Sequence, residues 1–121
     1  MVGNFDFLKG NIETIILNAL YGGDKYGYDI TREIKEKTDN QYEIKQPTLY
    51  GYLKKLESEK LIESYWGGES NGGRRKYYKL TQKGRELCIE YKSEWKFHKN
   101  VMESLVDSES SNDELLSLIH I

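Results

Sequence analysis

The side chains best suited to chemistry in this chain are cations gathered in its central part. Residues 45–85 carry 10 basic and 4 acidic side chains, whereas residues 1–44 and 86–121 are both net acidic. The overall net charge of -2 hides this arrangement. Because glycines and tyrosines accompany the cations, the pattern favours a polyanionic partner. The alternative is a basic face that is simply solvated.

Residue types needed for enzymatic or metal chemistry are scarce. One cysteine, Cys88, and two histidines cannot form the usual zinc sets, and Ser58, Ser64 and Ser70 have no nearby histidine to act as a base. The sequence contains no Gly-Lys-Ser/Thr phosphate-binding motif. We therefore expect no enzymatic activity, no cofactor and no metal site. Without a disulfide framework, a signal peptide or an apolar membrane span, we expect a cytoplasmic protein.

One helix, predicted for residues 47–60, positions part of the basic segment. At 100° per residue its three leucines, Leu49, Leu53 and Leu56, form a buried stripe. The opposite face carries lysines and has Gly51 at its centre. A glycine inside a helix costs about 1 kcal/mol relative to alanine, so Gly51 favours close approach of the backbone to a large partner. A solvated face that happens to contain a glycine explains this helix equally well.

Apolar spacing predicts the remaining elements. Helices are expected over residues 5–21 and 25–38, the second capped by Asp24, and residues 41–45 form a short strand at most. Residues 61–66 and 75–80 are typical of the two arms of a β-hairpin. Thr81 is expected to cap a long helix that ends near Val106. Helix, helix, helix and hairpin is the order of a winged helix-turn-helix, so we predict a mainly α fold with a small hairpin (α+β).

The long helix has a seam that predicts self-association. Apolar-leaning positions recur at alternating spacings of three and four, the 3.5-residue period of a coiled coil. A helix folded back on the first helix is the alternative, and both arrangements are compatible. We predict a homodimer. Its interface is expected to contain Cys88, Tyr91, Trp95, His98, Met102 and Leu105.

These elements divide the chain into three parts. Residues 1–80 are the predicted winged helix-turn-helix domain, residues 81–106 are the dimerisation helix, and residues 107–121 are a flexible acidic tail. The last six residues, LSLIHI, match what transposon mosaic-end DNA used in sequencing libraries encodes in one frame. We interpret residues 116–121 as a sequence artefact.

Three blocks of sequence resemble the PadR family of bacterial transcription regulators. They are KYGYDI at 25–30, PTLYGYLKKLESEKLI at 47–62 and SYWGGESNGGRRKYYKLTQKG at 64–84. The similarity is strongest to the short-tailed subfamily that includes multidrug-sensing repressors. It implies transcription regulation by a homodimeric repressor that binds duplex DNA. Pro47 and Lys60 depart from the family pattern, since many members have glycine at both positions.

The resemblance implies that the helix from Pro47 enters the major groove, while the wing reaches the adjacent backbone or minor groove. Tyr50 is interpreted as a phosphate donor, with a ring packed at the helix flank as an equal alternative. The candidate DNA-binding residues are Lys45, Thr48, Tyr50, Gly51, Lys54, Lys55, Asn71, Gly72, Gly73, Arg74, Arg75 and Lys76.

The resemblance also implies a ligand site at Trp95, which lies 11 residues after Gly84 as in multidrug-sensing relatives. There, one ring from each protomer would sandwich a flat aromatic molecule at the dimer interface. Lys92 and Lys99 replace an aromatic and an acidic residue of those relatives, which favours neutral or anionic aromatics. The other candidate ligand-binding residues are Phe7, Gly10, Asn11, Thr14 and Lys99.

Three alternatives stay open from the sequence. As an alternative to the ligand site, Trp95 is a residue packed in the dimer core. The repressor is then a DNA-binding protein without a small-molecule ligand. In a different class, the chain is a winged-helix protein-interaction module whose basic face meets an acidic protein instead of DNA.

Overall fold

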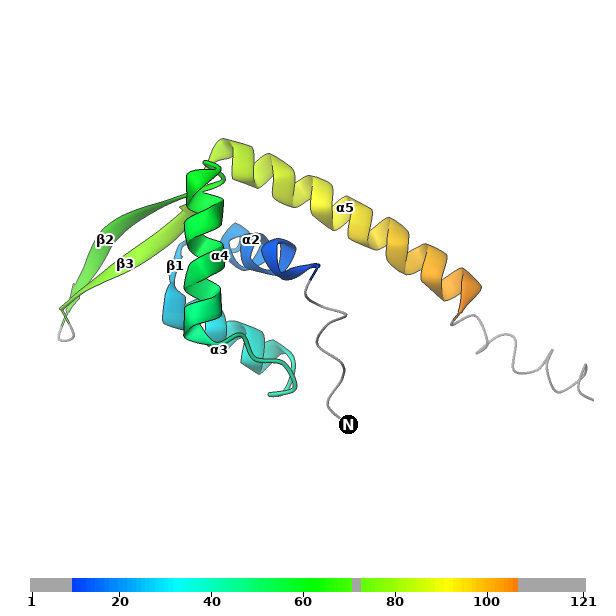
Figure 1. Ribbon diagram of the computed structural model, residues 1–121, viewed down its shortest axis with the longest axis horizontal. Helices are drawn as coiled ribbons and strands as arrows, with labels where there is room; N and C mark the ends of the chain where they lie inside the picture. The colour runs from blue at the N-terminus through cyan, green and yellow to red at the C-terminus, as the bar shows by residue number, and fades with distance from the viewer. Residues whose placement is uncertain (1–9, 71–72, 107–121) are drawn as a thin grey trace, which may run out of the picture. The chain divides into compact units, whose positions relative to one another are not determined.

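The computed structural model describes residues 10–70 and 73–106, and the chain divides into two compact units after Ile89. In the first unit lie α2 (Ile12–Tyr21), β1 (Lys25–Tyr26), α3 (Gly27–Lys37), α4 (Gln46–Ser58), β2 (Ile62–Ser70) and β3 (Gly73–Leu80) (Figure 1). Helix α5 (Gln82–Leu105) begins in the first unit and supplies the described part of the second. The predicted α+β class, mainly helical with a small antiparallel sheet, is confirmed. The predicted tail at residues 107–121 lies outside the described residues.

The core of the first unit is built from the apolar stripes of three helices. Ile16, Leu17 and Leu20 of α2 are fully buried, as is Ile30 of α3. All three leucines predicted to line α4 have no exposed surface. Helix α2 begins at Ile12 because residues 10 and 11 form a turn, so the predicted continuous helix over 5–21 is wrong. Within the described residues, no helix is long and apolar enough to cross a membrane.

The connection between α3 and α4 completes the helix-turn-helix. Asp39 and Asn40 have positive φ angles of 52° and 64°, which end α3 at the predicted place. Tyr42 and Ile44 are buried, yet residues 41–45 form no strand. The alternation of apolar and polar residues in this segment therefore comes from a loop whose Tyr42 and Ile44 side chains pack on the core. Helix α4 has Lys45 as its N-cap, so Gln46 belongs to the helix.

The sheet has the order β1–β3–β2 and is antiparallel throughout. Lys25 and Tyr26 pair with Tyr78 and Tyr77, so the helix predicted from residue 25 begins two residues later. The predicted cap by Asp24 is also wrong. Its carboxylate instead accepts a hydrogen bond from the Tyr65 hydroxyl at 2.6 Å.

Cross-strand pairing assigns the hairpin side chains to two faces, because directly opposite residues share a face. The inner face packs toward α4: Ser64 Oγ donates to Glu57 Oε2 at 2.7 Å. The outer face carries stacked tyrosine rings, with 5.7 Å between the Tyr65 and Tyr77 centroids. The inner face comprises Ile62, Ser64, Trp66, Lys76, Tyr78 and Leu80; the outer face comprises Glu63, Tyr65, Gly67, Arg75, Tyr77 and Lys79.

The junction of α4, β2 and α5 is tightly built. Lys60 has a positive φ of 63°, the conformation that glycine adopts at least cost. The predicted cap of the long helix is confirmed: the Gly84 N–H donates to Thr81 Oγ1 at 3.0 Å. A Cβ atom at Gly84 would lie 2.9 Å from the carbonyl carbon of Leu61. Glycine at this position therefore lets α5 approach the backbone before β2.

Candidate nucleic-acid interface

The outward face of α4 is flat and open. Pro47, Thr48, Gly51 and Lys54 are all exposed, opposite the buried leucines. A Cβ atom built at Gly51 meets nothing within 4 Å, so no intramolecular contact requires glycine there. The cost of a glycine inside a helix favoured a functional reason for Gly51. The open face at Gly51 is consistent with that reason, which is the close approach of a partner's backbone.

The two neighbouring lysines of α4 have different surroundings. Lys55 Nζ forms an ion pair with Glu13 Oε2 of α2 at 2.5 Å. The hydrogen bond and the charge of Glu13 raise the pKa of Lys55. Lys54 is exposed, and no carboxylate pairs with it within residues 10–70 and 73–106. Lys54 can therefore pair with a phosphate without first breaking an ion pair.

This difference gives a prediction. Lys54→Ala is expected to weaken duplex binding at least about fivefold to tenfold and to lower the magnitude of the log–log salt slope by about 2, because a dimer loses two cations. Lys55→Ala should have a smaller effect, because Lys55 must first release Glu13. Glu13→Gln is the matched control and should tighten binding by freeing Lys55. Fluorescence anisotropy with a labelled duplex measures all three, and equal losses for the two lysine variants would contradict the assignment.

Tyr50 joins the two helices of the motif. Its side chain is 45% exposed, but the ring lies against α3: a Cβ atom at Gly27 would come within 2.7 Å of Tyr50 Cζ. One turn earlier, Gln46 Nε2 donates to the buried Thr31 Oγ1 at 2.9 Å. These contacts fix the angle between α3 and α4 while leaving part of the Tyr50 phenol at the surface.

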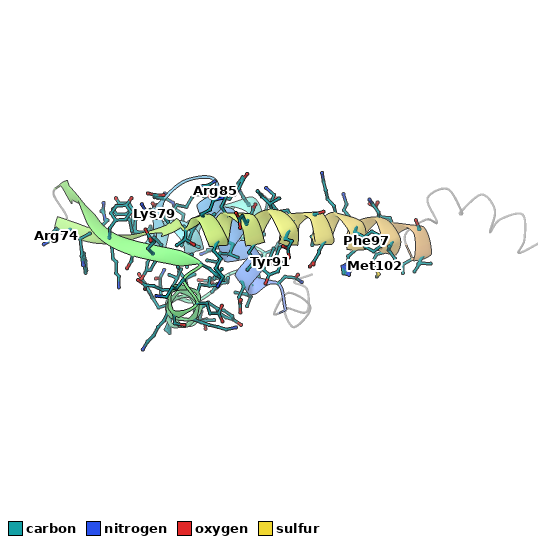
Figure 2. The ribbon with its side chains drawn as sticks, turned by 90° about the horizontal axis from the view of Figure 1, so that it is seen from above. Arg74, Lys79, Arg85, Tyr91, Phe97 and Met102 are labelled. Atoms are coloured by element: carbon teal, nitrogen blue, oxygen red, sulfur yellow. The ribbon has the colours of Figure 1, made fainter. Side chains whose placement is uncertain are left out.

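The wing cations are divided between the two faces of the hairpin. Arg74 lies over the Trp66 ring at 5.7 Å and Lys76 over the Tyr78 ring at 5.8 Å, both on the inner face. Arg75 lies over the Tyr26 ring at 4.8 Å, on the outer face. Figure 2 shows Arg74 at the end of the hairpin far from the helices. Gly73 has a positive φ of 83° at the start of β3. Asn71 and Gly72 lie outside the described residues.

Burial also affects a tyrosine that links the wing to α4. Desolvation raises the pKa of the Tyr78 hydroxyl, and the nearby Tyr50 and Glu57 add to the effect. The inner face contacts α4 through the hydrogen bond from Ser64 to Glu57, and Ser64 is the direct cross-strand partner of Tyr78.

The second unit exposes a long apolar stripe. Trp95 is 53% exposed, Met102 is 51% exposed and Leu105 is 74% exposed; Figure 2 labels Met102 near the end of α5. Phe97 and Val101 are exposed as well: at helical spacing Val101 lies beside the predicted seam, whereas Phe97 lies on the side of α5 away from Trp95. Among the other predicted seam residues, His98 is exposed with its ring 6.1 Å from that of Phe97, and Tyr91 is partly buried.

The structure corrects one member of the predicted interface. Cys88 has no exposed surface, because it is buried in the first unit. It is therefore unavailable to a partner chain.

The predicted ligand-binding residues belong to both units. Lys99 Nζ lies 5.7 Å from the centre of the Trp95 ring, within the second unit. In the first unit, Gly10 is exposed in a turn, while Asn11 and Thr14 are partly buried at the start of α2. Phe7 lies outside the described residues.

Comparison with known proteins identifies the family of this chain. The model of the transcriptional regulator PadR-like family matches residues 16–90. The chain belongs to this family. A transcriptional regulator from Clostridium thermocellum is 40% identical with a TM-score of 0.76, covering 87% of this chain and 99% of its own.

Two further similar proteins accord with this family assignment. A PadR family transcription regulator from hypervirulent Clostridium difficile is 41% identical with a TM-score of 0.72, covering 80% of this chain and 99% of its own. An uncharacterised protein from Lysinibacillus sphaericus is 37% identical over 102 residues, which is 84% of this chain and 94% of that protein. This PadR-like chain is a DNA-binding transcription regulator.

Sequence reasoning missed one exposed residue of the PadR-like wing. Trp66 is 58% exposed and pairs across the strands with Lys76, one of the predicted DNA contacts. The alternation of β3 was visible in the sequence, but the register that places Trp66 opposite Lys76 was not. The register therefore adds Trp66 to the surface that carries Arg74 and Lys76.

Proposed function

We propose that this PadR-like regulator is a homodimeric repressor that acts on operator DNA in the cytoplasm and is released by a planar aromatic ligand. In this proposal, α4 enters the major groove with Thr48, Gly51 and Lys54 toward the bases and backbone. The hairpin holds the adjacent backbone through its cations. The repressor role follows the resemblance to multidrug-sensing PadR-type repressors.

The observation that carries the proposal is the apolar stripe of α5 with Trp95 at its centre. Large exposed apolar patches mark interaction sites, and a second copy of α5 offers a complementary stripe. Two Trp95 rings, one from each protomer, then provide flat surfaces for a ligand. Stacking on an aromatic ring adds about 0.5–1.5 kcal/mol beyond burial.

The charge beside Trp95 supports one class of ligand. The Lys99 ammonium already lies over the ring at 5.7 Å. A cationic ligand would meet a like charge there, whereas an anionic or neutral aromatic would not. We therefore propose neutral or anionic planar aromatics as effectors.

Fluorescence of the Trp66→Phe variant, in which Trp95 is the sole tryptophan, tests the ligand site. Neutral and anionic planar dyes are expected to quench Trp95 saturably and to weaken duplex binding, since linkage makes the two effects reciprocal. Cationic dyes of the same size should bind less well, and Lys99→Glu should reverse this preference. If no dye quenches saturably, or if quenching leaves DNA affinity unchanged, the protein is a regulator without this ligand and Trp95 belongs to the dimer core.

A further inference from the structure

The inner face of the hairpin is covered by α4 over only part of its length. Near the base, Ile62, Tyr78 and Leu80 are buried, and Ser64 bonds to Glu57 of α4. Farther out, the same face carries Trp66, and 58% of this side chain is exposed. A large ring left open beside a packed surface favours a partner that covers it.

The immediate neighbours of Trp66 are cations. The Arg74 guanidinium lies over the indole at 5.7 Å, and Lys76 is its direct cross-strand partner. Both are exposed, and among the side chains that the structure describes, which exclude those of residues 69–72, neither has a carboxylate partner. On the other face of the sheet, Lys79 is paired with Glu63 at 3.7 Å. Two cations therefore adjoin the indole on the inner face.

This combination of one flat apolar ring and two cations matches the edge of a DNA duplex. Along each strand, deoxyribose rings alternate with phosphates, so a ring can pack on a sugar while neighbouring cations pair with the flanking phosphates. The cation–π contact with Arg74 holds the guanidinium next to the indole before DNA arrives. Little side-chain freedom then remains to be lost on binding.

The position of Trp66 favours DNA over a protein partner. The inner face meets α4 at the hydrogen bond between Ser64 and Glu57, and α4 is the helix that the proposed function places in the major groove. A duplex lying along α4 therefore meets the uncovered part of this face next. In the described structure, this face adjoins no surface that has been assigned to an acidic protein or to a second copy of the chain.

We infer that Trp66 is a DNA contact of the wing, packing on the sugar-phosphate backbone between phosphates held by Arg74 and Lys76. This inference rests on the proposed mode of DNA binding and extends it. It assigns to the hairpin an apolar contact in addition to its charges. Part of the affinity is then insensitive to salt, since burial of the indole releases no counterions.

The test uses the full chain and a fluorescein-labelled random 30-base-pair duplex at low salt. Trp66→Ala is expected to weaken binding about tenfold with an unchanged salt slope, while Trp66→Phe should lose only about twofold to threefold because a ring remains. Tyr65→Ala is the matched control: it removes an exposed ring from the same strand on the outer face. Its affinity should stay within about twofold of the wild type, provided that both alanine variants melt as the wild type does.

A second measurement reports on Trp66 directly. Adding unlabelled duplex to the wild type should change its tryptophan emission and protect it from acrylamide, and the Trp66→Phe variant at saturating duplex should lack this change. If wild type and both Trp66 variants bind alike and the emission does not respond, the inference is wrong while DNA binding stands. If the emission responds to protein concentration alone, a second copy covers Trp66 and the inference is also wrong. If the wild type binds no duplex, the proposed function fails with it.

Discussion

Gly51→Leu is expected to abolish specific DNA binding and leave the fold intact. Nothing in the described structure lies within 4 Å of a Cβ at this position, so the leucine side chain extends only outward. It would hold α4 away from the floor of the groove and break every base contact of the helix. We expect a loss of at least about 100-fold, within the roughly 10³–10⁷-fold gap between specific and non-specific binding.

Two measurements separate this effect from unfolding. Circular dichroism melting of Gly51→Leu should match or exceed the wild type, because leucine has the better helix propensity by somewhat less than about 1 kcal/mol. Gly51→Ala is the matched control: it gives the same gain in propensity with one methyl group and should bind with an intermediate loss. Normal binding by the leucine variant would show that α4 is not the reading helix.

Met102→Asp combined with Leu105→Asp is expected to convert the proposed dimer into monomers. Both side chains are exposed on the apolar stripe of α5, and two carboxylates in each protomer would be desolvated and brought near like charges on association. The variant should sediment as a monomer. It should also lose most of its operator affinity, since two half-sites are no longer bound together.

The same helix provides the control. Ser93 and Asn100 lie on the side of α5 away from the stripe, at helical spacing, and both are exposed. Ser93→Asp combined with Asn100→Asp adds the same charge and should remain dimeric. If the Met102 and Leu105 variant also stays dimeric in sedimentation velocity, the first helix of the chain makes the interface instead.

Local signals in the sequence predicted the described helices and the two arms of the hairpin, but they misplaced where α2 and α3 begin. The leucine spacing of α4 predicted its buried face, and Thr81 predicted the start of α5 through a cap that involves residues three apart. Such features depend on near neighbours in the chain. The α+β class followed from the order of these elements.

Features that depend on distant partners were not predictable in this way. Asp24 resembles a helix cap, but its carboxylate accepts a hydrogen bond from Tyr65, which is 41 residues away. Lys25 and Tyr26 pair with β3 and therefore belong to the sheet instead of the helix. Lys54 and Lys55 look equivalent in the sequence, and only the packing of α2 against α4 brings Glu13 to Lys55. Tertiary contacts override local propensity at such positions.

Lys60 shows how a departure from a family pattern is accommodated. Its φ of 63° is the left-handed conformation that glycine adopts at least cost. A lysine there costs roughly 1–2 kcal/mol more than glycine. The hydrogen bond from Leu61 N–H to the Leu56 carbonyl at 3.0 Å is of the kind that closes a helix end and holds this turn in place.

The salt dependence of duplex binding tests the central claim most directly. The predicted cations are Lys45, Lys54, Lys55, Arg74, Arg75 and Lys76 in each protomer. About half to two-thirds of a dimer's set are expected to meet phosphates, since Glu13 holds Lys55 and Arg75 lies on the outer face. Titrations of a labelled duplex between about 50 and 200 mM salt should then give a log–log slope of about -5 to -7. A slope near zero would contradict recognition of DNA through this surface.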